Sequence, residues 1–221
     1  MQDTLKELDK DTCAAFALFW NLCRSWVPAE IIDDIDTFTI GAGLPPMDPK
    51  IQDTHTGNYN ITLGTHTLTF ANARLAPAMG LAANNYARYF FFFFCCQTAD
   101  TYQLQRYIHH DNSPHEWAIS LTTERSCDDT NGGAFYFAEH GVCVAGAPNT
   151  IIAWRQTQYH GTSLQNLDPK DSKPLFSQRG LAIVTSPRLL NTYQRWKDGQ
   201  ISLAEAREEI VSTDSEDDII C

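Results

Sequence analysis

The N-terminal part of the chain carries apolar residues at the spacing of an α-helix. Over residues 3–26 these side chains recur at intervals that place them on one helical face. They are Leu5, Leu8, Ala15, Leu18, Phe19 and Leu22. Pro28 and a Pro/Gly-rich stretch over residues 41–49 follow. The pattern therefore predicts a helix over residues 3–26, closed by Pro28 and followed by a connector.

The next pattern has the period of two that is typical of β-strands. Beyond residue 58 the side chains of Tyr59, Ile61 and Leu63 alternate with polar ones, and the alternation resumes after Gly64 as far as residue 70. A glycine between two alternating stretches is typical of a turn. We therefore predict a β-hairpin over residues 58–70.

Short stretches of strand-forming residues dominate the second half of the chain. Clusters rich in Asp, Asn, Gly and Pro separate them at residues 128–133 and 146–149, and such clusters favour turns. The predicted strands cover residues 117–123, 134–138, 142–145, 150–154 and 181–185. Many short strands at this spacing favour a sandwich or a barrel.

The C-terminal part returns to helical periodicity over residues 189–211, where Ser202 and Glu205 have the spacing of an N-terminal capping box. Taken together, the patterns predict an α+β fold that is mainly β with flanking helices. We expect an N-terminal helix and connector over residues 1–50 and a β domain over residues 51–190. A C-terminal helix and an acidic tail follow over residues 191–221.

The composition and net charge of the chain bear on which classes of partner it can bind. The chain has 221 residues, 43% of them hydrophobic, which is enough for a real core. Its 16 Lys and Arg against 27 Asp and Glu give a net charge of −11, which opposes binding to phosphate backbones, although an acidic run at residues 214–218 accounts for part of it. Nucleic acid is therefore disfavoured as a partner.

Hydropathy and cysteine content bear on the compartment. The chain has no uncharged apolar run of 18 residues, and its first ten residues are charged and polar, so we expect an intracellular protein, nuclear or cytoplasmic, without a membrane segment. The seven cysteines are odd in number and lack C-x-x-C spacing. We therefore expect reduced thiols, with neither a disulfide framework nor a zinc site.

Three residues in the strand-rich half could hold one metal ion. His109 and Asp111 form an H-x-D pair, and alternate residues of an extended chain point the same way. His160 follows 49 residues after Asp111, the separation that a jelly roll needs to return the chain to the same place. Two histidines and one carboxylate are the ligand set of Fe(II) oxygenases. His110 and His115 stay as competitors for the first ligand.

Arginines near the predicted strands could bind a second carboxylate. Arg179 lies 19 residues beyond His160, just before the last predicted strand, and a guanidinium can clamp a carboxylate with two parallel hydrogen bonds. Arg125, Arg155 and Arg188 flank neighbouring strands and are alternatives for the same role. The remaining histidines are expected to be structural, and they are His55, His66 and His140.

With these residues in place, the sequence resembles a large group of fungal 2-oxoglutarate/Fe(II) oxygenase-like proteins, distantly similar to the TET/JBP enzymes that oxidise methyl groups on nucleobases. The resemblance covers residues 58–190. It is carried by residues 84–88 joined to 108–120, and by 132–135, 149–155, 160–164 and 180–185. It implies a double-stranded β-helix core, of the jelly-roll or cupin-like kind, with Fe(II) on His109, Asp111 and His160 and 2-oxoglutarate on Arg179.

The resemblance also implies a reaction, the hydroxylation of a C–H bond coupled to decarboxylation of 2-oxoglutarate, with Asp111 favouring hydroxylation over halogenation. The substrate would be a methylated nucleobase, or alternatively a small molecule or a protein side chain. A further alternative is an inactive pseudoenzyme with a disrupted β-helix. The chain departs from TET/JBP in lacking their wealth of basic residues. The sequence alone leaves the substrate and the oligomeric state open.

Residues 89–106 interrupt the resemblance. They include five consecutive phenylalanines, and the pair Arg88-Tyr89 recurs as Arg106-Tyr107, so that removing 18 residues joins the flanks seamlessly. Back-translation allows a splice donor, a pyrimidine-rich tract and an acceptor, which supports the hypothesis of a retained intron. The alternative is a buried strand followed by a loop. A spliced transcript that still encodes the phenylalanine run would remove the hypothesis.

Deleting residues 89–106, so that Arg88 joins Tyr107, is expected to raise solubility and thermal stability. Full burial of each phenylalanine is worth about 1.5–3 kcal/mol, and a barrel that evolved without five of them has no vacant groove of that size. We therefore expect the segment to lie outside the β core. The soluble fraction and the melting temperature of the deletion variant would check this, and unfolding of that variant would contradict it.

Overall fold

The computed structural model describes residues 2–44, 47, 59–63, 65–70, 76–77, 81–84, 108–125, 132–163, 178–185 and 187–212. The suspected insert at residues 89–106 and the acidic run at 214–218 lie outside the described residues. The chain divides into two compact units, Met1–Met79 and Gly80–Cys221. This division differs from the expectation of a β domain that begins at residue 51, because the predicted hairpin belongs to the first unit.

The described residues of the first unit include two helices. The predicted helix is confirmed as α1, Gln2–Trp26, which ends just before Pro28. A second helix, α2, Ala29–Ala42, was not predicted, although its buried isoleucines have helical spacing. Gly43 ends α2 in the left-handed conformation, at φ 63°, and its N–H donates to the carbonyl of Ile40. The described buried side chains of this helix pair are Phe16, Ala17, Phe19, Trp20, Cys23, Ile31, Ile32 and Ile35.

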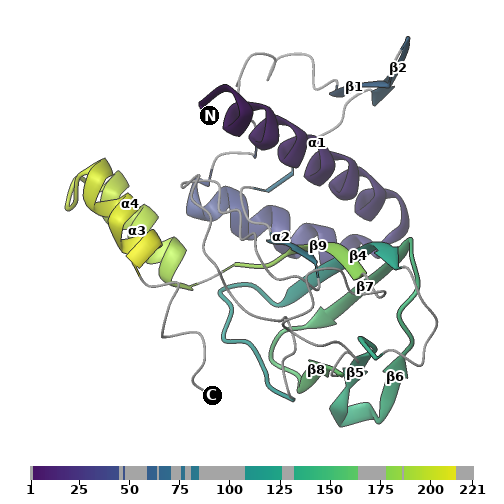
Figure 1. Cartoon of the computed structure of the whole chain (residues 1–221). Helices are drawn as coiled ribbons and strands as arrows, with labels where there is room; N and C mark the ends of the chain where they lie inside the picture. Colours follow the sequence, from purple (N-terminus) through teal and green to yellow (C-terminus); the bar gives the residue numbers. More distant parts are fainter. Residues whose placement is uncertain are drawn as a thin grey trace, which may run out of the picture. The chain divides into compact units, whose positions relative to one another are not determined.

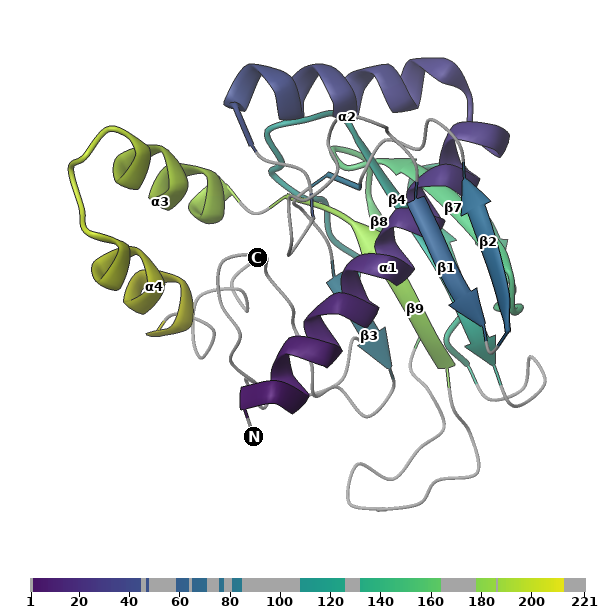
Figure 2. The same ribbon diagram turned by 90° about the horizontal axis from the view of Figure 1, so that it is seen from above.

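The predicted hairpin is confirmed as β1, Tyr59–Leu63, paired antiparallel with β2, His66–Phe70. The register places Leu63 opposite His66, so the connection contains only two residues. Figure 2 shows the two strands side by side.

The second unit contains two antiparallel sheets (Figure 1). The four-stranded sheet has the order β3-β9-β4-β7, and its strands are Leu81–Asn84, Gln178–Ile183, Trp117–Arg125 and Thr150–Arg155. The three-stranded sheet has the order β6-β5-β8, and its strands are Val142–Val144, Phe135–Phe137 and His160–Thr162. After β4 the chain passes to the smaller sheet for β5 and β6 and returns to the larger sheet for β7. It then crosses to the smaller sheet for β8 and comes back to the larger sheet for β9.

The two sheets meet through aromatic side chains. The ring of Trp154 on β7 lies 5.0 Å from that of Phe135 and 5.5 Å from that of His160, which belong to the smaller sheet. Trp154 therefore marks the face of the larger sheet that is turned toward the smaller one. Ile119 and Ile183 pair with each other on the opposite face, because strand residues alternate, and both are fully buried.

The five predicted strands are present with shifted ends, whereas β3 and β8 were not predicted.

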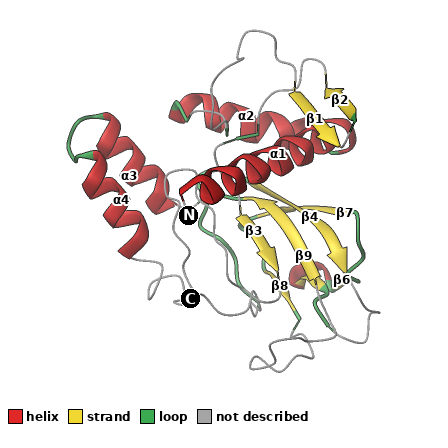
Figure 3. Cartoon of the chain, turned by 45° about the horizontal axis from the view of Figure 1, so that its top comes forward, coloured by secondary structure: helices red, strands yellow, loops and turns green. Residues whose placement is uncertain are grey.

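The helical segment expected at residues 189–211 is two helices, α3, Pro187–Lys197, and α4, Leu203–Ser212 (Figure 3). The predicted capping box is confirmed, because Glu205 N–H donates to Ser202 Oγ and Ser202 N–H donates to the Glu205 carboxylate. The hydrogen bond that the Ser202 N–H donates to the carboxylate is the largest cause of the lowered pKa of Glu205. The fold is thus a mixed α+β fold.

Two further expectations can be checked within the described residues. The described cysteines are not in disulfides, and they are Cys13, Cys23 and Cys143. Burial raises the pKa of the Cys23 thiol to about 12, which keeps it protonated at neutral pH. None of the described helices combines the length and the apolar character needed to cross a membrane.

Candidate metal centre

The candidate centre is built on a loop, residues 108–116, which we call the metal loop. At one point this loop pairs with β8, because His109 and His160 exchange two backbone hydrogen bonds of 2.8 Å. At a second point Asp111 N–H donates to the carbonyl of Gln156 at 2.7 Å. The loop thus touches the smaller sheet through β8 and the end of β7 in the larger sheet. These attachments bring residues 49 positions apart in the sequence together.

The three predicted ligands converge. His109 Nε2 lies 3.5 Å from Asp111 Oδ1, and His160 Nε2 lies 3.3 Å from Asp111 Oδ2. One ligand atom from each residue lies within 4.8 Å of the other two. Two atoms about 2.1 Å from one metal ion are about 3.0 Å apart at a right angle and about 3.4 Å apart at the tetrahedral angle. The spacing of the three side chains therefore suits one metal ion.

The hydrogen bonding of His160 prepares its ring for a metal. Nδ1 lies 2.8 Å from the carbonyl oxygen of Gln158, so this nitrogen carries a proton and donates it. In the neutral ring, Nε2 then presents a lone pair to the Asp111 carboxylate at 3.3 Å. Two acceptors at this distance are stable only with a cation or a proton between them. A histidine that binds a metal through one ring nitrogen usually donates the N–H of its other ring nitrogen to a carbonyl or carboxylate, as His160 does here.

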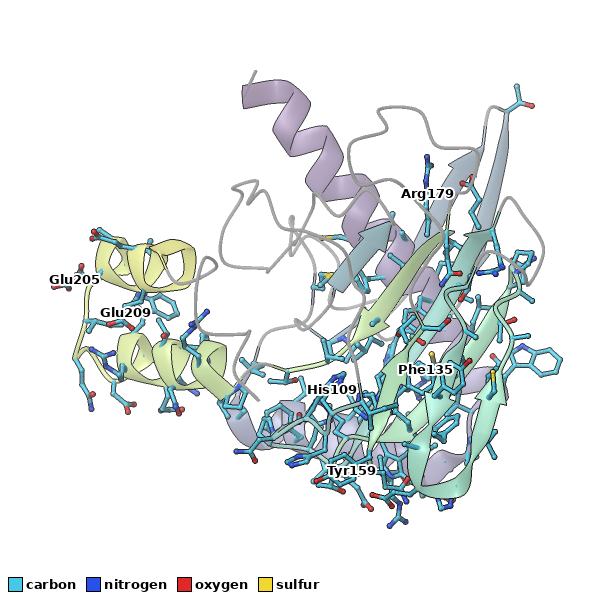
Figure 4. The ribbon with its side chains drawn as sticks, turned by 60° about the horizontal axis from the view of Figure 1, so that its bottom comes forward. His109, Phe135, Tyr159, Arg179, Glu205 and Glu209 are labelled. Atoms are coloured by element: carbon cyan, nitrogen blue, oxygen red, sulfur yellow. The ribbon has the colours of Figure 1, made fainter. Side chains whose placement is uncertain are left out.

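An aromatic wall holds His160 in place. Its ring is stacked on Phe135 at 5.7 Å and 18°, and is tilted against Trp154. His160 is 3% exposed, whereas Asp111 and His109 are half-buried at the edge of the site. The site therefore has one closed side, formed by the sheets, and one side from which solvent or a substrate can reach it. Figure 4 shows His109 and Phe135 in this region.

The competing histidines do not join the cluster. His110 is exposed and its ring meets Tyr159 edge-on at 5.4 Å, on the other side of the extended chain from His109. His115 is buried and bonds to Thr185 through Nε2. The H-x-D register predicted from the sequence therefore agrees with the positions of the side chains.

Arg179 is not brought to the metal cluster. It pairs with Glu124 in the sheet, carries 57% side-chain exposure, and forms an ion pair with that glutamate at 3.4 Å. About 20 Å of extended chain separates it from Thr185, which contacts the metal loop. Alternation along β9 also places its side chain on the face of Ile183, away from the smaller sheet. Figure 4 shows Arg179 and His109 well apart.

The alternative arginines differ in position. Arg125 pairs with Gln178 at the same far end of the sheet, and its guanidinium donates to the Gln178 side chain and to the carbonyl of Gly132. Arg155 follows Trp154 and points to the opposite face, where it pairs with Glu116 at 3.0 Å. Neither guanidinium is directed at the cluster.

Arg188 is the alternative that follows Thr185, a residue bonded to the metal loop. It is half-buried in the first turn of α3, three residues after Thr185. The carbonyl of Thr185 accepts a hydrogen bond from Ser113, and its hydroxyl contacts His115, both of which belong to the metal loop. Of the four predicted arginines, Arg155 and Arg188 therefore lie at this end of the fold, and the guanidinium of Arg155 is paired with Glu116 on the face away from Trp154.

Sequence reasoning missed the residues that support the ligands. Gln156, Gln158 and Phe135 have no motif of their own, and two of them act through backbone carbonyls that any residue could supply. Gln156 alone offered a signal, because it is a polar residue directly after an apolar strand.

Comparison with known proteins found no matching family model, no significantly similar curated protein and no significantly similar solved structure. The resemblance to oxygenases therefore rests on the residues and on the geometry described above.

Proposed function

We propose that the two sheets are those of a double-stranded β-helix. The larger sheet has four strands, and His109 extends the smaller sheet from three strands to a fourth position beside β8. Two facing four-stranded antiparallel sheets, with the chain crossing repeatedly between them, make up a jelly roll. The strand order and the contacts of Trp154 with the smaller sheet support this assignment.

The proposed activity is that of an Fe(II)- and 2-oxoglutarate-dependent hydroxylase. The observation that carries the proposal is the convergence of His109, Asp111 and His160, with both imidazole Nε2 atoms facing the same carboxylate. Two histidines and one carboxylate on one side of a metal leave its other positions open, which is the ligand set of the non-haem iron oxygenases. When bound, the iron and its cosubstrate supply the activation of O₂.

The residues of the chain contribute binding, orientation and exclusion of water. Gln158 fixes the tautomer of His160, and Phe135 and Trp154 close one side of the site with apolar rings. A cosubstrate bound at the metal needs a cation for its distal carboxylate. We assign this role to Arg188 rather than Arg179, because Arg188 lies three residues after Thr185, which bonds to the metal loop.

The charge balance favours a substrate other than duplex nucleic acid. The chain has 11 more acidic than basic residues, and binding to phosphates depends on lysine and arginine. A small molecule or a protein side chain therefore fits better than a methylated base in DNA.

The proposal predicts succinate formation from 2-oxoglutarate that requires both Fe(II) and O₂. Arg188→Ala is expected to raise the KM for 2-oxoglutarate by more than about 10-fold, because removing one hydrogen-bonded charge partner costs about 2–5 kcal/mol of binding. Arg179→Ala, which changes an exposed surface pair, is expected to leave that KM within about twofold. Full-length protein without Fe(II)-dependent succinate release under these conditions would contradict the proposed activity.

A further inference from the structure

The metal loop is attached to the larger sheet by buried polar side chains that are not ligands. His115, Gln156 and Thr185 are 6%, 2% and 5% exposed. They are three of the five buried polar residues in the described part of the chain. Buried polar groups are costly unless they are hydrogen-bonded, and these three are bonded to one another and to the loop. Their concentration at one end of the sheet indicates a specific role.

Gln156 holds the loop at two places. Its backbone carbonyl accepts the N–H of Asp111 at 2.7 Å, and its own N–H donates to the carbonyl of Glu116 at 2.9 Å. Its side-chain nitrogen lies 3.1 Å from the carbonyl of His115 and 3.3 Å from that of Trp117. Because Gln156 directly follows β7, the position of the Asp111 backbone is set from the end of that strand.

His115 continues this network to β9. The amide nitrogen of Gln156 lies 3.3 Å from His115 Nδ1. Nε2 of the same ring lies 2.9 Å from the hydroxyl of Thr185 and is hydrogen-bonded to it. The carbonyl of Thr185 also accepts from Ser113. The network thus joins the end of β7, the metal loop and the chain just beyond β9.

We infer that Gln156, His115 and Thr185 are positioning residues, which hold the Asp111 carboxylate in register with His109 and His160 before a metal binds. Hydrogen-bonded networks of buried side chains rigidify a site, so that the ligands are already close to their final positions before a metal binds. The consequence for metal affinity rests on the proposed function. The consequence for the order of the loop follows from the hydrogen bonds alone.

The metal test uses Co(II) titration of the full-length protein, followed by its visible absorption. Gln156→Leu and Thr185→Val are each expected to weaken Co(II) binding by roughly fivefold, the effect of losing one net hydrogen bond that holds the loop. In the double variant the loss of Co(II) binding free energy is expected to be smaller than the sum of the two single losses, because both residues act through His115. Gln194→Leu, an exposed glutamine bonded to Asp198, is the matched control and is expected to stay within about twofold.

The second test is hydrogen exchange of the metal-free protein. In both variants, peptides covering residues 108–116 are expected to exchange faster than in the parent, whereas peptides from α3 and α4 keep the parental rate. Thr185→Val decides the matter if Gln156→Leu does not fold, because it only exchanges a hydroxyl for a methyl group. Unchanged Co(II) affinity together with unchanged exchange in folded variants would overturn the inference. A parent that binds no Co(II) but shows the exchange effect would overturn the proposed function and leave the positioning network standing.

Discussion

Replacing Asp111 by asparagine is expected to lower Fe(II)-dependent turnover by more than about 100-fold. Loss of a residue that only supports a metal ligand already lowers metal affinity or activity by about 10–100-fold. The amide keeps the size of the side chain and the backbone hydrogen bond to Gln156, but it removes the charge that both imidazoles face. In the metal-free protein the same change is expected to leave stability intact, because an amide can donate a hydrogen bond where the carboxylate only accepts. Succinate release and thermal unfolding would measure the two effects.

Glu116→Gln is the matched control for this variant. It makes the same change of charge in the same loop, at a carboxylate that pairs with Arg155 and is about half exposed. Exposed ion pairs are worth about 0–1 kcal/mol, so both activity and stability are expected to be close to those of the parent. An Asp111→Asn protein that retains parental turnover would show that Asp111 is not a ligand.

Replacing His160 by alanine is expected to remove metal binding and also to destabilise the protein, by about 2–3 kcal/mol. The loss of stability is expected because His160 is 3% exposed and lies against Phe135 and Trp154, so its removal leaves a cavity. Urea unfolding with a chelator present would measure the loss.

Metal binding provides the second readout for His160. At a metal concentration 100 times the Kd, a site in the parent is expected to add about 2.7 kcal/mol to the free energy of unfolding, and the His160→Ala variant is expected to gain none. His110→Ala, which changes the exposed neighbour of a ligand, is expected to keep both the parental stability and the metal response. Equal stabilisation of the parent and the His160→Ala variant by metal would refute the ligand assignment.

Much of the local structure could be predicted from the sequence. Periods of 3.6 and 2 in the sequence predict helix α1, the hairpin β1–β2 and strand β4. The spacing of Ser202 and Glu205 predicts the capping box. These features depend on neighbours within a few residues. The missed strand β8 has the sequence His-Gly-Thr, and its glycine disfavours a strand.

The sequence also determined which three side chains form the candidate centre, because the H-x-D pair is local and His160 could be placed by its distance along the chain. What supports and surrounds the centre was decided by the tertiary structure. The bonds of His115 to Gln156 and to Thr185 join residues 41 and 70 positions apart, and no local period encodes them. The position of Arg179 likewise depends on the register of β9 against β4, which placed the side chain beside Glu124 on the face away from the smaller sheet. Sheet order and register arise from the packing of whole strands, so only the folded chain shows which polar groups meet.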